Sequence, residues 1–236
     1  MEIIPVIDLL DGQVVRAQRG ERHAYLPIES ALCHSNEPQV VARKLLELYP
    51  FKTLYIADLN AIQRRDNHLT TIAAIRTAYP DINLWLDAGF SGMETCQPWL
   101  HLDLTLVVGS ESLRDIDTLV EMRTQLGGEQ LVLSLDWRAD TPQGPAALFE
   151  NADCWPQRVI VMPLSRVGSY SGPELDRLAQ ILRINQNRAI YAAGGVRNRE
   201  DLQTLQTMGI SGALLASTLH DKKISQAELA MLATAK

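Results

Sequence analysis

The chain has 236 residues, of which 46% are hydrophobic and 21% are charged, and its net charge is −6. This length suits one α/β barrel or two small domains. The acidic balance, with no Lys/Arg run longer than two residues, argues against a nucleic-acid-binding protein. No apolar stretch approaches the ~20 residues of a membrane span. Glu2 and Asp8 interrupt any apolar run of the kind found in signal peptides, so we expect a cytoplasmic protein.

Eight short apolar runs alternate with longer amphipathic segments along the chain. Each run is continuously apolar, as is typical of parallel strands covered on both faces. They span residues 3–8, 53–58, 82–89, 104–110, 131–136, 158–164, 189–195 and 213–217. Only the fifth connection, with ALFENADCW, is poor in helix signal. Eight such units predict a single (β/α)8 barrel domain over residues 1–236, for which ~250 residues is typical; a doubly wound sheet is the competing architecture.

The sequence also contains a faint internal repeat. LWLDAGFS followed by LVVGS, in the third and fourth runs, resembles IYAAGGVRN followed by LLAS in the seventh and eighth. Asp8 closes the first run and Asp136 closes the fifth. The chain therefore looks like two half-barrels related by a pseudo-twofold axis. The longest connection, from Gln13 to Pro38, follows the first run, and in a barrel it would lie over the active face.

The glycine-rich run ends predict phosphate binding. Glycine lets backbone N–H groups approach an anion closely, and a following helix N-terminus adds partial positive charge. The loops after the seventh and eighth strands are the usual phosphate site of a barrel. Ordinary tight turns are the alternative reading of a single glycine loop, but two matching pairs favour anion binding. The candidate residues are Gly89, Ser91, Gly109, Ser110, Gly194, Gly195, Ala216 and Ser217.

Asp8 and Asp136 are the candidate acid–base pair. They end strands four units apart, so they would face each other across the mouth of a barrel. One protonated and one ionised carboxyl suit proton-transfer chemistry, although each residue alone could cap a turn or helix. Asp58 also ends a strand, where it could bind a substrate hydroxyl or cap the next helix. In the first connection, Arg16, with the neighbouring Arg19 and Arg22, could clamp a phosphate or carboxylate or lie on a solvated strand edge.

Several stretches together resemble the histidine-biosynthesis barrel isomerases and their cyclase relatives. They are IPVIDLLDGQVVR, LYIADLNA, VVGS, LSLD, SRVGSYSGP and AAGGVRNREDLQTLQTMGISGALLAS. The isomerases convert a phosphoribosyl-formimino aminoimidazole carboxamide ribotide (ProFAR) from its aldose to its ketose form. The resemblance implies that Asp8 is the general base and Asp136 the general acid of an Amadori rearrangement. It implies no metal or redox cofactor, and it adds Ser165, Arg166 and Gly168 of the sixth loop as substrate-binding residues.

The chain also departs from the isomerase pattern. Met162 and Pro163 replace a Thr-Asp pair at the end of the sixth strand, and Asp87 introduces a negative charge near one expected phosphate. Ala216 stands after the eighth strand where the isomerases have a glycine, and Val167 stands before the glycine of the sixth loop where they have an aspartate. With these departures, the sequence resembles an isomerase-related subgroup of proteins found in methanogens and methylotrophs.

Three functions therefore stay open at the level of sequence. The first is isomerisation of a phosphorylated sugar derivative. The second is a lyase or cyclase step on a related phosphate in C1 or pterin cofactor synthesis. The third is a non-catalytic barrel that binds a phosphorylated metabolite or a protein. All but the last imply a small phosphorylated substrate, with no nucleic acid or membrane partner; the sequence does not give the oligomeric state.

Overall fold

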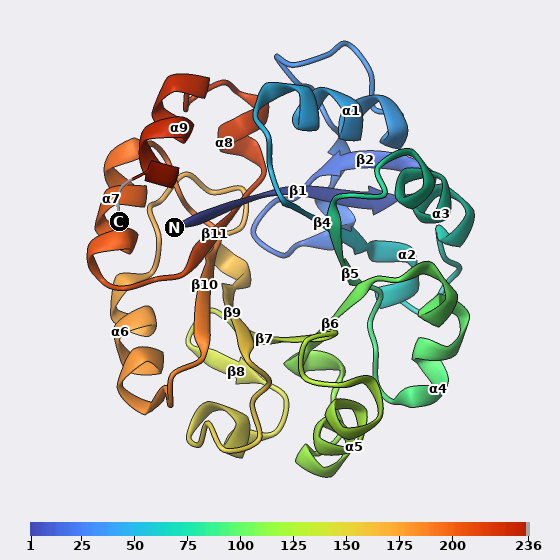
Figure 1. The fold of residues 1–236 in the computed structure, drawn as a ribbon, viewed down its shortest axis with the longest axis vertical. Coiled ribbons are helices and arrows are strands. Elements are labelled where there is room, and N and C mark those ends of the chain that lie inside the picture. The colour runs from blue at the N-terminus through green and yellow to red at the C-terminus, as the bar shows by residue number, and fades with distance from the viewer. Residues whose placement is uncertain (235–236) are drawn as a thin grey trace.

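The computed structural model describes residues 1–234, and side chains as far as Leu232. Eight parallel strands form a closed barrel in which the last strand pairs with the first, Glu2 opposite Gly212 and Pro5 opposite Leu215. Helices surround this barrel on the outside (Figure 1). The barrel strands are β1 (Glu2–Leu10), β4 (Thr53–Asp58), β5 (Asn83–Asp87), β6 (Thr105–Gly109), β7 (Leu131–Arg138), β9 (Arg158–Pro163), β10 (Ala189–Ala193) and β11 (Gly212–Leu215). The predicted (β/α)8 barrel is confirmed.

The connections are mostly helical, as the amphipathic segments predict. The helices are α1 (Pro38–Leu48), α2 (Leu59–Ile62), α3 (Leu69–Ala78), α4 (Met93–Cys96), α5 (Ile116–Leu126), α6 (Leu175–Ile184), α7 (Arg199–Thr207), α8 (Ser217–His220) and α9 (Gln226–Thr234). The fifth connection instead forms the short strand β8 (Thr141–Gln143), antiparallel to β7, and a 3-10 turn. None of the helices within residues 1–234 combines the length and apolar character needed to cross a bilayer.

Two apolar layers hold the barrel together. One lies between the strands and the surrounding helices. The other fills the barrel interior, where Trp85 of β5 and Tyr191 of β10 make an edge-to-face contact with ring centroids 4.9 Å apart. Because side chains alternate along a strand, the residues two and four positions beyond an interior residue also point inward. The interior therefore continues upward from Ile4 to Asp8 on β1, from Trp85 to Asp87 on β5, and from Val132 to Asp136 on β7.

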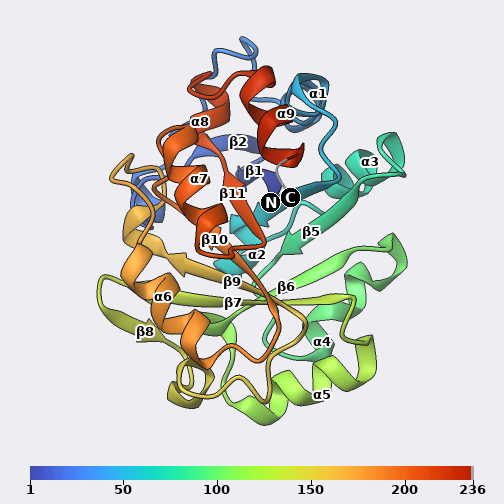
Figure 2. The ribbon, with the colours of Figure 1, turned by 60° about the vertical axis from the view of Figure 1, so that its left-hand side comes forward.

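The first connection folds over the carboxyl ends of the strands. It contains β2 (Gln13–Arg16), which is antiparallel to β1, then a 3-10 turn, and β3 (Leu26–Pro27), which pairs with β2. Its path is visible beside β1 when the molecule is turned (Figure 2). The Arg19 N–H donates to the Val167 carbonyl (2.8 Å), so this connection is attached to the loop after β9. At Gly168 of that loop a Cβ atom would lie 2.0 Å from the Ala17 carbonyl oxygen, so only glycine allows this contact.

Candidate active site

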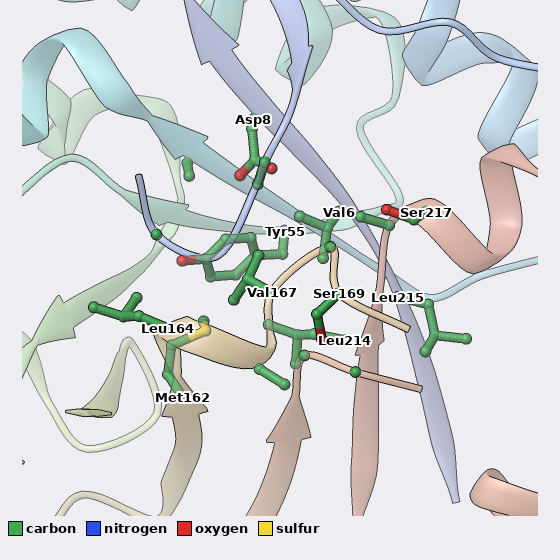
Figure 3. A pocket seen from close by; sticks show the side chains of 18 of the residues that line it. Val6, Asp8, Tyr55, Met162, Leu164, Val167, Ser169, Leu214, Leu215 and Ser217 are labelled. Carbon is green, nitrogen blue, oxygen red and sulfur yellow. The ribbon is translucent and has the colours of Figure 1, made fainter. Parts of the chain in front are cut away.

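A cavity opens at the carboxyl ends of the barrel strands, where barrel enzymes place their chemistry. Its floor is formed by interior side chains such as Val6, Tyr55, Met162 and Leu214, and its roof by Gly20, Arg22 and Tyr25 of the first connection. Asp8 projects from β1 above Tyr55, with Met162 on the β9 side and Ser217 on the β11 side (Figure 3). Asp8 and Asp136 both line this cavity.

The Asp136 carboxyl is buried and held in place by hydroxyl and amide donors. The Ser134 hydroxyl donates to Oδ1 (2.6 Å), while the Ser110 hydroxyl and the Glu111 N–H approach Oδ2 at 3.3 Å. Burial raises the pKa of Asp136 to about 8; Ser134 opposes this shift, and the charges of Glu111 and Asp87 add to it. At neutral pH this group is therefore mostly protonated and able to donate a proton.

Asp8 has a different environment. No hydrogen bond among residues 1–234 involves its carboxyl group, which faces the cavity and is half-buried. Burial raises the pKa of Asp8 to about 7, the positive charge of Arg22 lowers it, and the charge of Asp87 raises it. A carboxyl without fixed donors and with a pKa near neutrality can exchange a proton with a bound molecule.

The loops after β10 and β11, across the cavity from β5, present backbone N–H groups that have no hydrogen-bond partner among the described residues. No hydrogen bond within residues 1–234 uses the N–H groups of Gly194, Gly195, Ala216 or Ser217, and all four residues line the cavity. Gly195 has φ +81°, and a Cβ there would lie 2.2 Å from the Gly172 carbonyl oxygen, so the conformation requires glycine. Helix α8 is a single turn and contributes little dipole. The loop N–H groups form the candidate anion cradle.

Within the described part of the chain, the loops after β5 and β6, which the pseudo-twofold axis relates to this cradle, do not present such free N–H groups to the cavity. Gly89, Ser91, Gly109 and Ser110 are not among the residues that line the cavity. The Gly89 N–H donates to Asp87 Oδ1 (3.0 Å) and the Ser91 N–H to the Thr95 hydroxyl (3.1 Å). These contacts, together with the bond between the Ser110 hydroxyl and Asp136, disfavour a second phosphate site at the four residues, which stays a prediction.

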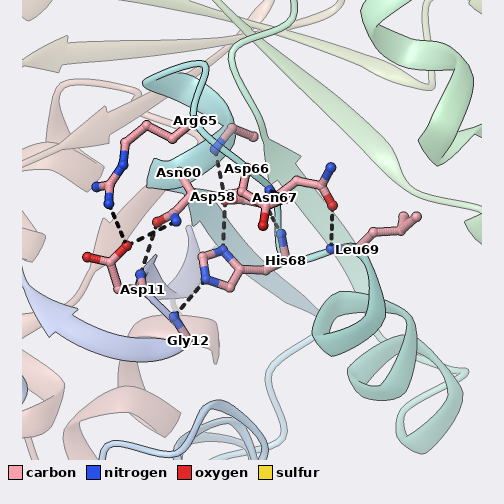
Figure 4. A network of polar contacts seen from close by, with 10 residues as sticks. Asp11, Gly12, Asp58, Asn60, Arg65, Asp66, Asn67, His68 and Leu69 are labelled. Atoms are coloured by element: carbon pink, nitrogen blue, oxygen red, sulfur yellow. Dashed lines mark hydrogen bonds and ion pairs between the residues drawn. The ribbon is translucent and has the colours of Figure 1, made fainter.

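Asp58 stabilises the loops outside the cavity. It is fully buried, caps α2 through the Ala61 N–H (3.1 Å), and accepts from the His68 N–H (2.6 Å). The His68 ring joins Asp58 (2.8 Å) to the Gly12 N–H (2.9 Å), as Figure 4 shows. The proposed substrate-hydroxyl role of Asp58 is therefore wrong, and the alternative, a helix cap, is what the structure contains.

The predicted basic clamp is also different in the structure. Arg16 makes a bidentate ion pair with Asp221 (2.5 and 3.0 Å) and lines a small neighbouring pocket with Ala216 and Ser217 rather than the main cavity, so its anion-binding role stays a prediction. Arg19 is exposed. Arg22 does line the cavity, where it forms an ion pair with Glu111.

In the sixth loop the structure separates the three predicted residues. Gly168 lines the main cavity, whereas Ser165 and Arg166 do not, and the Arg166 guanidinium donates to the Ser171 carbonyl (3.2 Å). A substrate-binding role for Ser165 and Arg166 is thus not supported by their position.

Sequence reasoning missed three cavity residues: Tyr25, Tyr55 and Glu111. The Tyr55 hydroxyl, 3.4 Å from Asp87 Oδ2, comes from an inward position of β4. The period-two pattern of that strand could have identified it. Tyr25 and Glu111 lie in loops and carry no such signal.

The fold and the cavity define a (β/α)8 barrel whose cavity is lined by two carboxyls, Asp8 and Asp136, and by the N–H groups of the candidate anion cradle. The sequence pattern of the family described as "Histidine biosynthesis protein" matches residues 2–225, and the chain belongs to this family. The resemblance seen in the sequence is thereby confirmed.

Individual relatives match over nearly their whole length. An uncharacterized protein of Methanocaldococcus jannaschii is 32% identical over 93% of both chains. Proteins named 1-(5-phosphoribosyl)-5-((5-phosphoribosylamino)methylideneamino) imidazole-4-carboxamide isomerase (ProFAR isomerase) are similar as well. That of Cenarchaeum symbiosum is 28% identical, over 95% of this chain and 97% of its own. That of Lactiplantibacillus plantarum is 27% identical, over 97% and 98%.

Proposed function

We propose that this protein is an isomerase that converts a phosphorylated aldosylamine into the corresponding aminoketose by an Amadori rearrangement. The observation that carries the proposal is the joint placement of Asp8 and Asp136 in one cavity that also contains the free N–H groups of the anion cradle. The names of the relatives from Cenarchaeum symbiosum and Lactiplantibacillus plantarum support the same class of reaction.

The first half of the reaction opens the sugar ring. Protonated Asp136 gives its proton to the ring oxygen, and the bond between this oxygen and C1 breaks. The nitrogen lone pair forms the C1–N double bond, so an iminium cation results. The raised pKa of Asp136 keeps the proton available at neutral pH. The neighbouring carboxylates favour the positive charge that develops on the iminium.

The second half moves hydrogen from C2 to C1. Ionised Asp8 removes the C2 proton, and the electron pair of that bond neutralises the iminium to give an enolamine. Asp8 then returns its proton to C1, while Asp136 takes the proton of the C2 hydroxyl as the ketone forms. Both carboxyls end in their starting states, so the cycle balances without another reactant.

The chain provides weak support for ProFAR itself as substrate. Met162 lines the cavity at the end of β9 and Pro163 follows it, and neither has a hydrogen-bonding side chain. Loss of one well-placed transition-state donor costs on the order of 10²–10³ in rate. We therefore expect little turnover of ProFAR and propose a smaller phosphorylated aldosylamine.

The test follows the hydrogen that Asp8 transfers between C2 and C1. We expect the purified protein to exchange a C1 hydrogen of 1-amino-1-deoxyribulose 5-phosphate with deuterium from D2O, detected by NMR, and Asp8→Asn to abolish the exchange. The dependence of kcat/KM on pH should be bell-shaped between pKa values of about 7 for Asp8 and about 8 for Asp136. Glu121→Gln, an exposed carboxylate on α5, is the matched control.

Other outcomes would overturn the proposal. Release of a fragment or ring closure, seen as a new product, would indicate a lyase or cyclase. Binding without exchange or turnover would indicate a binding protein. Robust complementation of a ProFAR isomerase deletion strain, abolished by Asp8→Asn, would show that the substrate is ProFAR after all.

A further inference from the structure

The charges of the cavity are unevenly distributed. Its charged lining residues are four carboxyls and one guanidinium: Asp8, Asp87, Glu111, Asp136 and Arg22. Asp87 is the last residue of β5, Glu111 follows β6 and Asp136 lies in β7, so the three come from neighbouring strands, and we call them the acidic wall. The anion cradle belongs to β10 and β11 and contains no carboxylate. The two ends of the cavity therefore favour ligand groups of opposite charge.

The acidic wall occupies the region where the pseudo-twofold would place a second phosphate. Its carboxylates use the N–H groups that would bind an anion: Asp87 accepts from Gly89, and Asp136 accepts from Glu111. An added Cβ on Gly109 would lie 3.1 Å from Asp136 Oδ2 and 3.8 Å from Asp87 Oδ2, so both oxygens border the same small space. A phosphate in that space would face these carboxylates, which already accept from the N–H groups of Gly89 and Glu111.

The one cation in the lining does not reverse this balance. Arg22 is already paired with Glu111, and both side chains are about one-quarter exposed, at 27% and 23%. The Arg22 charge also lowers the pKa of Asp87, but among the described residues neither Asp87 nor Asp136 forms an ion pair with a cationic side chain. A ligand could supply that partner.

We propose that the acidic wall binds the cationic nitrogen of the iminium and of the protonated aminoketose product, so that the site accepts a singly phosphorylated amino-sugar derivative and disfavours a bisphosphate. This inference rests on the proposed function, because it assigns the phosphate end of the substrate to the cradle and the nitrogen end to the wall. The nitrogen end is also where the iminium charge forms during ring opening. Opposite charges at close range in a partly desolvated cavity attract, while a second phosphate would be repelled.

Proton release should accompany the binding of such a ligand. The wall carboxyls resist ionisation in the free protein: burial raises the pKa of Asp87 to about 6 and that of Asp136 to about 8. A nearby ammonium group favours the ionised carboxylates and lowers both pKa values. At pH 7 the complex therefore holds fewer protons than the free protein.

Three ligands that differ only at C1 test the inference: 1-amino-1-deoxyribulose 5-phosphate, ribulose 5-phosphate and ribulose 1,5-bisphosphate. We expect isothermal titration calorimetry at pH 7 to show the amine binding about tenfold or more tighter than ribulose 5-phosphate. The bisphosphate should bind no tighter than ribulose 5-phosphate. Titrations in buffers of different ionisation enthalpy should show proton release with the amine alone.

Charge-removing variants identify the wall as the source of the preference. Asp87→Asn retains an oxygen that can accept from Gly89, so the loop geometry is preserved while the charge is lost. We expect this variant to lose most of the amine preference and to gain affinity for the bisphosphate. Glu121→Gln on the outer face of α5 should leave all three affinities unchanged, and circular dichroism checks that each variant is folded.

The inference and the proposed function fail in different ways. The amine-binding role of the acidic wall would be overturned if the bisphosphate bound most tightly of the three ligands. It would also be overturned if the preference for the amine survived Asp87→Asn. Either result could occur in a protein that isomerises aldosylamines. The expected order of affinities without any C1 hydrogen exchange would support the wall and overturn the isomerase. Binding of none of the three ligands would overturn both.

Discussion

Replacing Asp136 with asparagine should inactivate the protein and also stabilise it at neutral pH. The unfolded chain ionises this carboxyl near its ordinary pKa of 3.8, whereas the folded chain ionises it near 8. Between these values the folded state binds more protons than the unfolded state, so the contribution of Asp136 to folding stability falls as the pH rises. The asparagine side chain of the variant has no charge, and its contribution should not change with pH.

The magnitude follows from the pKa difference. At pH 7 the folded state holds the proton about three pH units above the unfolded pKa, and each unit corresponds to 1.36 kcal/mol, so the penalty is roughly 4 kcal/mol. The amide NH2 of asparagine would meet the Glu111 N–H, which now donates to Oδ2, and this donor–donor contact costs about 1–2 kcal/mol. We expect a net stabilisation of about 2–3 kcal/mol at pH 7.

Urea unfolding followed by circular dichroism at pH 5 and pH 8 measures this effect. The wild-type protein should lose more stability between these pH values than Asp136→Asn does, and kcat/KM of the variant should fall by at least about 10²-fold. Glu121→Gln should behave as wild type in both assays. A variant that is less stable than wild type at pH 8, with an unchanged pH dependence, would refute the raised pKa of Asp136 and its role as the proton donor.

Three further substitutions test separate parts of the site. Gly195→Ala should weaken binding of inorganic phosphate by about tenfold or more, because the residue has φ +81° and no space for a Cβ. Arg22→Ala should move the acidic limb of the pH–rate profile to higher pH, because the guanidinium charge lowers the pKa of Asp8. Asp58→Ala should destabilise the fold by about 2–4 kcal/mol, since it removes a buried carboxylate that caps α2 and holds His68.

Each of these substitutions has an informative control. Gly209→Ala also changes a glycine with positive φ, at +84°, but in open space, so it should leave phosphate affinity unchanged. Arg19→Ala removes an exposed arginine of the same connection and should not move the pH profile. Asp58→Asn should cost less stability than Asp58→Ala. Equal phosphate affinity for Gly195→Ala and wild type would exclude the cradle, and an unmoved acidic limb in Arg22→Ala would exclude Asp8 as the base.

The architecture and the two candidate carboxyls were predictable from the sequence. Eight continuous apolar runs with helical connections favour a parallel barrel, because strands covered on both faces need no polar alternation. Asp8 and Asp136 lie near strand ends at positions that the period-two alternation directs toward the barrel axis. The glycine pattern after β10 likewise predicted the candidate cradle, since positive φ values and close backbone contacts require glycine there.

Which neighbouring polar groups line the cavity depends on contacts between distant parts of the chain. Asp58 ends β4, and Asp8 lies near the end of β1. Asp58 follows Ala57, which lines the cavity, and so points outward, where it meets His68 and the start of α2. Arg16 and Arg22 lie in one connection, yet Asp221 pairs with the first and Glu111 with the second. These pairings join residues far apart in the chain. Local sequence cannot specify them, because they depend on how loops from different strands meet above the barrel.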